Sequence, residues 1–446
     1  MLKRIFSIIF VIILLISTIL PSFAVSAFEV TEFEITANAG MLVSLDTDEV
    51  LFEKNADQKI YPASVTVIMT ALLMLESDKW DPAGKVAMTD EALKLVLGTG
   101  CAVTHTKAGE EFTQRDLLAF VIMTACGDAI YLASSYYGES VEEFVAMMNA
   151  KAQELGLTGT NFTNPIGLHD DNHYTTARDI YTLTRYALQN KEFKEAADTD
   201  RYPMEATNMS GSRLLSTTNM LIDSTTNYKY EYAHGVKTGY TDEAGRCVVS
   251  TATYNEYNYM CILMGCPTNK GKRVEFTETA ELYRWAFLNF SFKQIAKSNE
   301  PVCEMPVKLS FDTDFVPLHF KEPFLTVLPN EADESTLVVK THLKSETVNA
   351  PVKKGTVLGY AEIMYAERVI GKVDLVAGRS IEESGLLVAA DTVKNIFTSI
   401  YMKVLFWAAI IAIILFVVLC IKLNMDRLKK RRVKYKPYKG EKKHEK

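Results

Sequence analysis

The sequence predicts a mixed α/β (α+β) fold with helices packed on an antiparallel sheet, followed by a small all-β domain and one membrane-spanning helix. Three observations in the 446-residue chain support this order. Residues 28–291 contain apolar stretches with helical spacing, and strand-like runs flank them. Residues 302–385 contain short runs that alternate between apolar and polar residues. Residues 404–421 form an apolar run of 18 residues without a charge.

The first domain is predicted to open with a hairpin and to contain a clearly delimited helix. Residues Met41–Asn55 have the pattern of two strands around the turn Asp46–Asp48. Residues Ser140–Leu155 have the pattern of a helix, because Ser140 and Glu143 show capping-box spacing and Gly156 follows the last turn.

The chain outside the membrane is too long for one ordinary hydrophobic core, which indicates two domains. We place the first at residues 28–291 and the second, a β-sandwich, at residues 302–385. Residues 292–301 are the expected junction, and the alternating run Leu337–Thr341 is typical of the second domain. Residues 385–403 are expected to form a helix that leads to the membrane span.

The two ends of the chain indicate export and membrane attachment. Residues 1–27 combine Lys3 and Arg4, an apolar run and small residues up to Ala27, as in a secretory signal peptide; an uncleaved anchor is the alternative. As a helix, residues 404–421 would extend about 27 Å, enough to cross the hydrocarbon core of a bilayer. Residues 422–446 carry twelve Lys or Arg against three Asp or Glu, which predicts a cytoplasmic tail by the positive-inside rule.

The charge distribution limits the partners. The basic tail could suggest nucleic-acid binding, but its topological role already explains it, so no nucleic-acid partner is expected. Anionic lipid head groups are a further partner that would fit the tail. The chain has a formal net charge of −7, and without the tail and the basic N-terminus the exterior part carries −18. Such an acidic surface argues against binding DNA or acidic polymers by bulk charge.

A serine ahead of a helical run carries the most informative motif. Residues Tyr61–Thr70 read Y-P-A-S-V-T-V-I-M-T, with Ser64 before the apolar run. By itself such a serine is often a helix N-cap. The motif resembles the nucleophile motif of the penicillin-binding serine D-alanyl-D-alanine carboxypeptidases, in which a lysine follows the serine by three residues. Here Val67 stands at that position, and its methyl groups can accept no proton from a hydroxyl.

A second segment resembles the K-T-G strand of the same family. Residues 234–247 read H-G-V-K-T-G-Y-T-D-E-A-G-R-C. The resemblance implies that Lys237 and Thr238 face the substrate carboxylate, and that Gly239 leaves room for a peptide along the strand. It also implies that the backbone amides of Ser64 and Tyr240 form an oxyanion hole.

The remaining motifs of the family are altered. The family has S-G-N-D-A where Met123–Ala129 read M-T-A-C-G-D-A, which puts Ala125 at the serine and Gly127 at the asparagine. Neither side chain can form a hydrogen bond. The family's carboxylate-binding arginine falls at Glu275, which would repel a carboxylate; Arg273 is the alternative.

The resemblance covers about residues 28–385 and implies a β-lactamase-like fold for the first domain. Further segments similar to the family are Asn164–Leu168, His173–Asp179, Ser216–Asn219 and Ala350–Gly355.

The cysteines and histidines indicate packing rather than metal binding. The seven cysteines lack C-x-x-C spacing, and most lie in apolar stretches, so we expect small buried thiols. The resemblance places Cys126 near Ser64 as a possible replacement nucleophile, but no base is identified for it and packing is favoured. His169 and His173 have no third ligand nearby and are expected to make structural hydrogen bonds. No metal and no cofactor is expected.

Two functions fit this sequence. In the first, the chain is a membrane-anchored extracytoplasmic member of the family, whose cleft binds D-Ala-D-Ala stem peptides of peptidoglycan, β-lactams or wall-synthesis partners without catalysis. In the second, it is a slow or altered carboxypeptidase in which Ser64 attacks and Lys237 or a water acts as base. The joint changes at Val67, Ala125 and Gly127 favour the first function.

Overall fold

The computed structural model describes residues 33–268, 271–295, 300–332 and 336–433. The chain forms two units. The first comprises residues up to Ile295 together with Leu325–Leu337, and the second comprises the rest of the chain. The predicted signal peptide, residues 1–27, and the end of the basic tail lie outside the described residues.

The first unit is built on a five-stranded antiparallel sheet in the order β2-β1-β9-β8-β7. Its strands are β1 (Ala39–Ser44), β2 (Val50–Lys54), β7 (Ala233–Thr241), β8 (Gly245–Tyr254) and β9 (Tyr257–Cys266). Strands β1 and β2 confirm the predicted opening hairpin. Because β1 pairs with β9, the two ends of this unit meet in the middle of the sheet.

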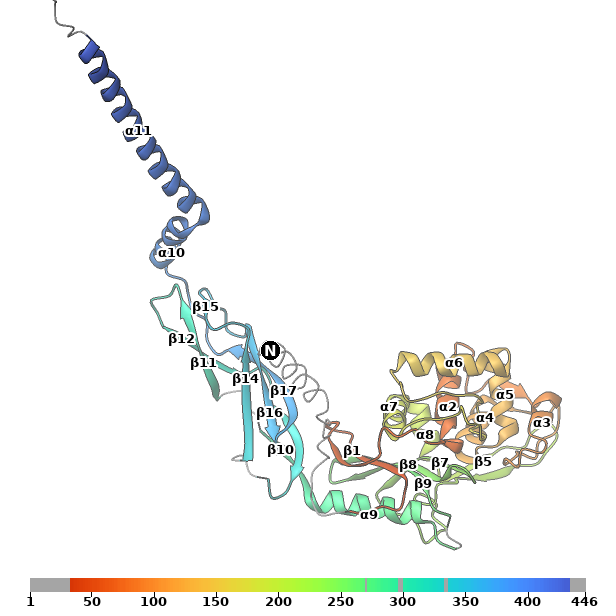
Figure 1. Ribbon diagram of the computed structural model, residues 1–446. Helices are drawn as coiled ribbons and strands as arrows, with labels where there is room; N and C mark the ends of the chain where they lie inside the picture. The colour runs from red at the N-terminus through yellow and green to blue at the C-terminus, as the bar shows by residue number, and fades with distance from the viewer. Residues whose placement is uncertain (1–32, 269–270, 296–299, 333–335, 434–446) are drawn as a thin grey trace, which may run out of the picture. The chain divides into compact units, whose positions relative to one another are not determined.

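Both faces of the sheet are covered, which explains the continuous apolar sequence of β9. Successive side chains of a strand point to opposite faces. Accordingly, Tyr259 and Leu263 belong to the apolar cluster that includes α9 (Val274–Asn289), whereas Met260 and Ile262 belong to the cluster of the other helices. Figure 1 shows α9 on one side of the sheet and these helices on the other.

The helical layer contains α2, the most deeply buried helix, in which every residue from Val67 to Leu75 is buried. The helices of this layer are α2 (Val67–Glu76), α3 (Asp90–Leu95), α4 (Gln114–Ala119), α5 (Gly127–Gly138), α6 (Val141–Glu154), α7 (Ala177–Ala187) and α8 (Lys191–Ala197). Two small two-stranded antiparallel sheets accompany them: β3 (Lys85–Ala87) with β4 (Glu111–Thr113), and β5 (Arg201–Met204) with β6 (Arg213–Ser216). Helix α6 confirms the predicted helix, because Ser140 Oγ accepts the Glu143 amide at 3.0 Å and Gly156 follows at a φ of +72°.

The second unit contains an all-β part, as predicted. Its six strands are ordered β14-β16-β17-β12-β11-β15. They are β11 (Pro301–Lys308), β12 (Phe315–Phe320), β14 (Leu337–Leu343), β15 (Val348–Asn349), β16 (Val357–Tyr365) and β17 (Arg368–Ala377). The sequence predicts a sandwich, but hydrogen bonds join all six strands in one sheet because β12 pairs with both β11 and β17. The remaining pair, β10 (Phe290–Gln294) with β13 (Leu325–Pro329), groups with the first unit.

Two helices follow the second sheet, α10 (Gly385–Thr398) and α11 (Ile400–Val433). The apolar run predicted at residues 404–421 lies within α11. Residues Ile400–Leu428 are long and apolar enough to cross a membrane, and their most apolar window of 18 residues has a mean hydropathy of 3.3. The helix continues into the basic tail as far as Val433.

Candidate active site

A cleft of about 880 Å³ lies in the first unit between the serine turn, β7 and the start of α9. It is lined by six of the predicted site residues: Ser64, Ala125, Lys237, Thr238, Gly239 and Tyr240. The other two, Val67 and Gly127, are not among the residues that line it. The serine turn and the K-T-G strand are therefore brought together as the resemblance implies.

Ser64 lies in a short 3-10 turn, η1 (Ala63–Thr66), which leads directly into α2. The N-cap position of this turn is Pro62, so Ser64 does not act as a helix cap. Ala63 has a left-handed backbone with a φ of +49°, which costs a residue with a side chain about 1–2 kcal/mol. The turn presents a half-buried Ser64 to the cleft, and no described side chain hydrogen-bonds to its hydroxyl.

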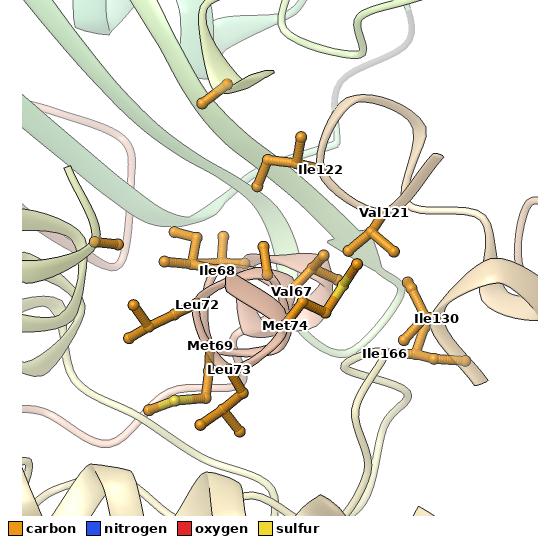
Figure 2. Packing of buried hydrophobic residues seen from close by; sticks show 14 of the residues in the cluster. Val67, Ile68, Met69, Leu72, Leu73, Met74, Val121, Ile122, Ile130 and Ile166 are labelled. Carbon is orange, nitrogen blue, oxygen red and sulfur yellow. The ribbon is translucent and has the colours of Figure 1, made fainter. Parts of the chain in front are cut away.

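The side chain of Val67 is fully buried in the core. It belongs to the apolar cluster around α2, which also includes Val121, Ile130 and Ile166 (Figure 2). The position of the family's base therefore holds hydrocarbon in hydrocarbon surroundings. Nothing at this position can accept the proton of Ser64.

The second motif follows a π-helical turn, η2 (Phe120–Thr124). Ala125 comes next with a φ of +51° and reaches the cleft with only a methyl group. The neighbouring Thr124 hydroxyl also lines the cleft, but it donates to the Phe120 carbonyl at 2.7 Å and contacts Cys126 Sγ at 3.1 Å. The motif keeps a tight backbone turn, and the Thr124 hydroxyl bonds within this turn.

Cys101 occupies the space that a side chain at Gly127 would need. A Cβ added to Gly127 would lie 2.4 Å from Cys101 Sγ and 3.0 Å from a methyl carbon of Val96. Cys101 Sγ also lies 2.9 Å from the Thr99 hydroxyl, and both residues line the cleft. The sequence predicts only a packing role for Cys101, because no motif connects residue 101 with residue 127.

Lys237 is a buried cation of the cleft, with 1% of its surface exposed. Its Nζ donates to the Thr238 carbonyl at 2.9 Å, and no described carboxylate forms an ion pair with it. Burial lowers the pKa of Lys237 to about 8. A part of the Lys237 population is therefore neutral near neutral pH.

Gly239 allows β7 to pack directly on the serine turn. A Cβ at this position would lie 2.9 Å from the Ser64 backbone nitrogen and 3.1 Å from the Pro62 carbonyl oxygen. The sequence predicts that Gly239 leaves room for a bound peptide, but the structure gives this space to the turn. The contact fixes Ser64 against β7, next to Tyr240.

Glu275 and Arg273 both reach the cleft from the start of α9. The Glu275 carboxylate is 1% exposed, accepts a hydrogen bond from Arg273 Nε at 2.6 Å, and lies 3.7 Å from Arg246 Nη1. The sequence predicts that Glu275 would repel a carboxylate, with Arg273 as the alternative binding residue; in the structure the Glu275 carboxylate is itself paired with Arg273 and lies near Arg246. Sequence reasoning missed Arg246, although it stands in the segment that follows K-T-G.

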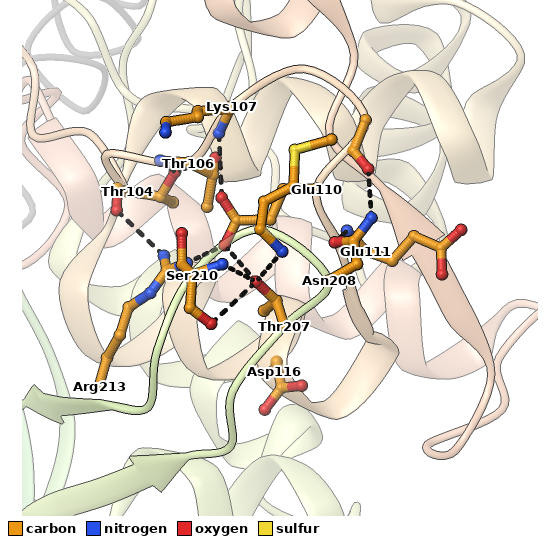
Figure 3. Close-up of polar contacts among 12 residues, drawn as sticks. Thr104, Thr106, Lys107, Glu110, Glu111, Asp116, Thr207, Asn208, Ser210 and Arg213 are labelled. Atoms are coloured by element: carbon orange, nitrogen blue, oxygen red, sulfur yellow. Dashed lines mark hydrogen bonds and ion pairs between the residues drawn. The ribbon is translucent and has the colours of Figure 1, made fainter.

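A buried ion pair supports the loop that carries Cys101. Glu110 is fully buried, forms an ion pair with Arg213 of β6, and accepts a hydrogen bond from the Thr207 hydroxyl at 2.8 Å (Figure 3). On the same loop, the Thr104 hydroxyl donates to Asp128 at 2.6 Å, one residue after Gly127. This network joins the loop to β6 and to α5, and so positions the second motif.

The predicted packing roles of Cys126 and His173 agree with their surroundings. Cys126 is buried, and burial raises the pKa of its thiol to about 12, far from that of a reactive thiolate. His173 bonds to the Thr66 hydroxyl at 2.8 Å and to the Thr163 amide at 3.1 Å, and burial lowers its pKa to about 4. Within the described part of the chain, no group of three or more His, Cys, Asp or Glu could hold a metal ion.

The fold and the cleft define a class of protein. A serine turn packed against a K-T-G strand, on an antiparallel sheet with helices on both faces, is the arrangement of the penicillin-binding, β-lactamase-like serine fold.

Comparison with known proteins gives the family. Residues 26–268 match the family described as D-alanyl-D-alanine carboxypeptidase, and residues 290–383 match the C-terminal domain of penicillin-binding protein 5. The chain therefore belongs to the D-alanyl-D-alanine carboxypeptidase family of low-molecular-weight penicillin-binding proteins.

The similarity covers most of the chain. The D-alanyl-D-alanine carboxypeptidase DacF of Bacillus subtilis is 29% identical over 84% of this chain and 95% of its own length. DacC of Escherichia coli is 28% identical over 79% of this chain and 86% of its own. Among solved structures, penicillin-binding protein 5 of Haemophilus influenzae aligns with a TM-score of 0.63 at 26% identity, over 79% of this chain and all of the other.

Proposed function

We propose that this protein is a membrane-anchored, extracytoplasmic member of its family that binds stem peptides or β-lactams reversibly and does not form an acyl-enzyme. The observation that carries this proposal is the environment of Val67. The residue at the position of the base is an aliphatic side chain, buried among Val121, Ile130 and Ile166.

The chemistry of acyl transfer gives the size of the expected defect. A serine hydroxyl must lose its proton to become a competent nucleophile. Loss of the base from a nucleophile–base pair costs roughly 10⁴–10⁶-fold in rate in serine hydrolases. Ala125 cannot relay a proton, and Cys101 fills the space next to Gly127. Three changes, one that lines the cleft and two in the core behind it, therefore act against the same covalent step.

The second candidate function is a slow serine hydrolase in which Lys237 takes the proton of Ser64. Its support is the pKa of about 8, which leaves about a tenth of the Lys237 amines neutral at pH 7. This mechanism predicts a rate that rises with pH up to about 8. It also predicts that Lys237→Arg abolishes the reaction, because arginine stays protonated.

The place of the protein in the cell follows from its two ends. The apolar residues Ile400–Leu428 are proposed to span the membrane once. The basic residues after this span are proposed to face the cytoplasm, and both folded units then face the cell wall. In this arrangement the cleft would meet peptidoglycan, the material on which the family acts.

The decisive experiment looks for a covalent penicillin adduct on the full-length protein in detergent micelles. The purified protein is incubated with a fluorescent penicillin and its intact mass is measured, with Ser64→Ala as matched control. We expect no adduct on either protein. An adduct on the wild type that is absent from Ser64→Ala would establish the hydrolase function. The pH profile and Lys237→Arg would then test the base.

A further inference from the structure

One end of the cleft contains a carboxylate that belongs to the protein itself. Glu275 lies at the start of α9 and lines the cleft with Arg273 and Arg246. Its Oε1 accepts from Arg273 Nε at 2.6 Å and lies 3.7 Å from Arg246 Nη1. The Arg246 guanidinium also lies over the ring of Tyr240, 5.1 Å from its centroid, next to the K-T-G strand.

The charges along the cleft do not favour an anion. Among the described residues that line it, Lys237, Arg246 and Arg273 are cationic, and four carboxylates oppose them. These are Asp223, Asp242, Glu243 and Glu275. Both arginines nearest to Glu275 already interact with its carboxylate, so a free carboxylate of a ligand would compete with an anion that is built into the fold.

The ion pairs between Glu275 and the two arginines leave some polar atoms without hydrogen bonds, which distinguishes them from a purely structural ion pair. Glu275 Oε2 and Arg246 Nε are both buried, and neither has a hydrogen-bond partner in the described structure. A buried structural pair is normally stabilised by hydrogen bonds to all of its polar atoms. An amide supplies one acceptor and one donor, the complements of an unpaired N–H and of an unpaired carboxylate oxygen. A second carboxylate supplies acceptors only.

We propose that Glu275 makes this end of the cleft selective for an uncharged amide of a peptide and against a free terminal carboxylate. The amide is the carboxamide end of a peptide or a peptide bond of a chain that continues past this point. This inference rests on the proposed function, in which the cleft holds peptides reversibly, and it narrows the ligands of that function. It favours stem peptides whose chain continues past this point over a free D-Ala-D-Ala end or a β-lactam, both of which carry a carboxylate. Glu275 acts as a specificity residue and takes no part in a bond-breaking step.

The test compares two synthetic peptides that differ only at the end. Both carry N-acetyl-L-Lys-D-Ala-D-Ala with a dansyl label on the lysine; one ends in a free carboxylate and the other in a carboxamide. Binding is followed by fluorescence anisotropy with the full-length protein in detergent micelles. The variants are Glu275→Gln, which removes the charge at constant shape, and Glu281→Gln, which removes a charge from an exposed position of the same helix that does not line the cleft.

We expect the wild type to bind the carboxamide at least about tenfold more tightly than the carboxylate. Glu275→Gln should lose this preference through tighter binding of the carboxylate, and Glu281→Gln should keep it. The proposal is overturned if the wild type prefers the carboxylate, if both variants change the ratio equally, or if neither peptide binds any of the three proteins. The ratio measured on the wild type decides the question even if Glu275→Gln fails to fold.

The covalent and reversible assays can fail independently. A penicillin adduct on the wild type would refute the proposed function and leave the ratio of the two peptides unaffected. A penicillin also carries a carboxylate, so the adduct assay is repeated on Glu275→Gln. An adduct formed only by this variant would support the role of Glu275 and refute the loss of chemistry at Ser64.

Discussion

The substitution Val67→Lys, which restores the lysine of the family motif, should destabilise this protein rather than repair it. Val67 is fully buried, and the cluster that surrounds it is apolar. The polar side chains of the second motif are absent at Ala125 and Gly127, so a lysine amine would have the Ser64 hydroxyl beside it but no polar group of that motif. A buried ammonium without a charged partner is strongly disfavoured.

The magnitude follows from linkage between protonation and folding. A fully buried, unpaired lysine has a pKa of about 5.5, against about 10.4 in an unfolded chain. At pH 7 the amine is neutral in the folded protein but protonated in the unfolded chain. Protonation stabilises the unfolded chain by about 1.4 kcal/mol for each of the roughly 3.4 pH units between pH 7 and the pKa of 10.4. The penalty is then about 5 kcal/mol. Because the folded pKa is the lower one, the penalty decreases as pH rises, to about 2 kcal/mol at pH 9.

The assay is urea unfolding of the full-length protein in detergent, followed by the fluorescence of Trp80 and Trp285 in the first unit. Val67→Met is the matched control, because methionine has a similar length and no charge. The free energies of unfolding of the two variants should differ by about 5 kcal/mol at pH 7 and by about 2 kcal/mol at pH 9. Equal stabilities at pH 7 would refute the reasoning, since the site would then accommodate an ammonium.

Three further predictions concern the cleft and its support. Gly127→Asn should destabilise the protein, because the added Cβ would lie 2.4 Å from Cys101 Sγ. In the double variant, Cys101→Ala should recover about 1–3 kcal/mol of the free energy of unfolding. Additive effects of the two substitutions in a double-mutant cycle would exclude this contact. Lys237→Met should raise the free energy of unfolding by about 2–3 kcal/mol at pH 7, because burial depresses the pKa of Lys237 in the folded protein to about 8. This gain should vanish as the pH rises from 8 to 10.5, and a gain that does not depend on pH would contradict the prediction. Glu110→Gln should lower the melting temperature through a loss of about 3–5 kcal/mol, whereas Glu111→Gln, on an exposed pair, should cost less than about 1 kcal/mol; similar losses would refute the importance of the buried pair.

The sequence alone predicted a mixed α/β unit followed by an all-β part and an apolar helix, and it named six of the residues that line the cleft. Local patterns carried this information. The alternating strands of the second unit, the capped helix α6 and the apolar run in α11 each depend on neighbours within a few residues. The same holds for the motifs around Ser64 and Lys237, where a fixed spacing of residues implies a fixed chemistry.

Only the tertiary structure decided how the altered cleft is filled. Cys101 occupies the space beside Gly127, Gly239 makes room for the serine turn, and Glu275 is paired with Arg273 and Arg246. Each of these contacts joins residues that are separated along the chain or whose spacing matches no motif. Packing depends on which side chains are neighbours in the folded state. The spacing of residues along the sequence does not show which side chains of different helices, strands and loops become neighbours. For this reason the sequence identified valine at the position of the family's lysine, whereas the residues that fill the altered cleft became visible only in the fold.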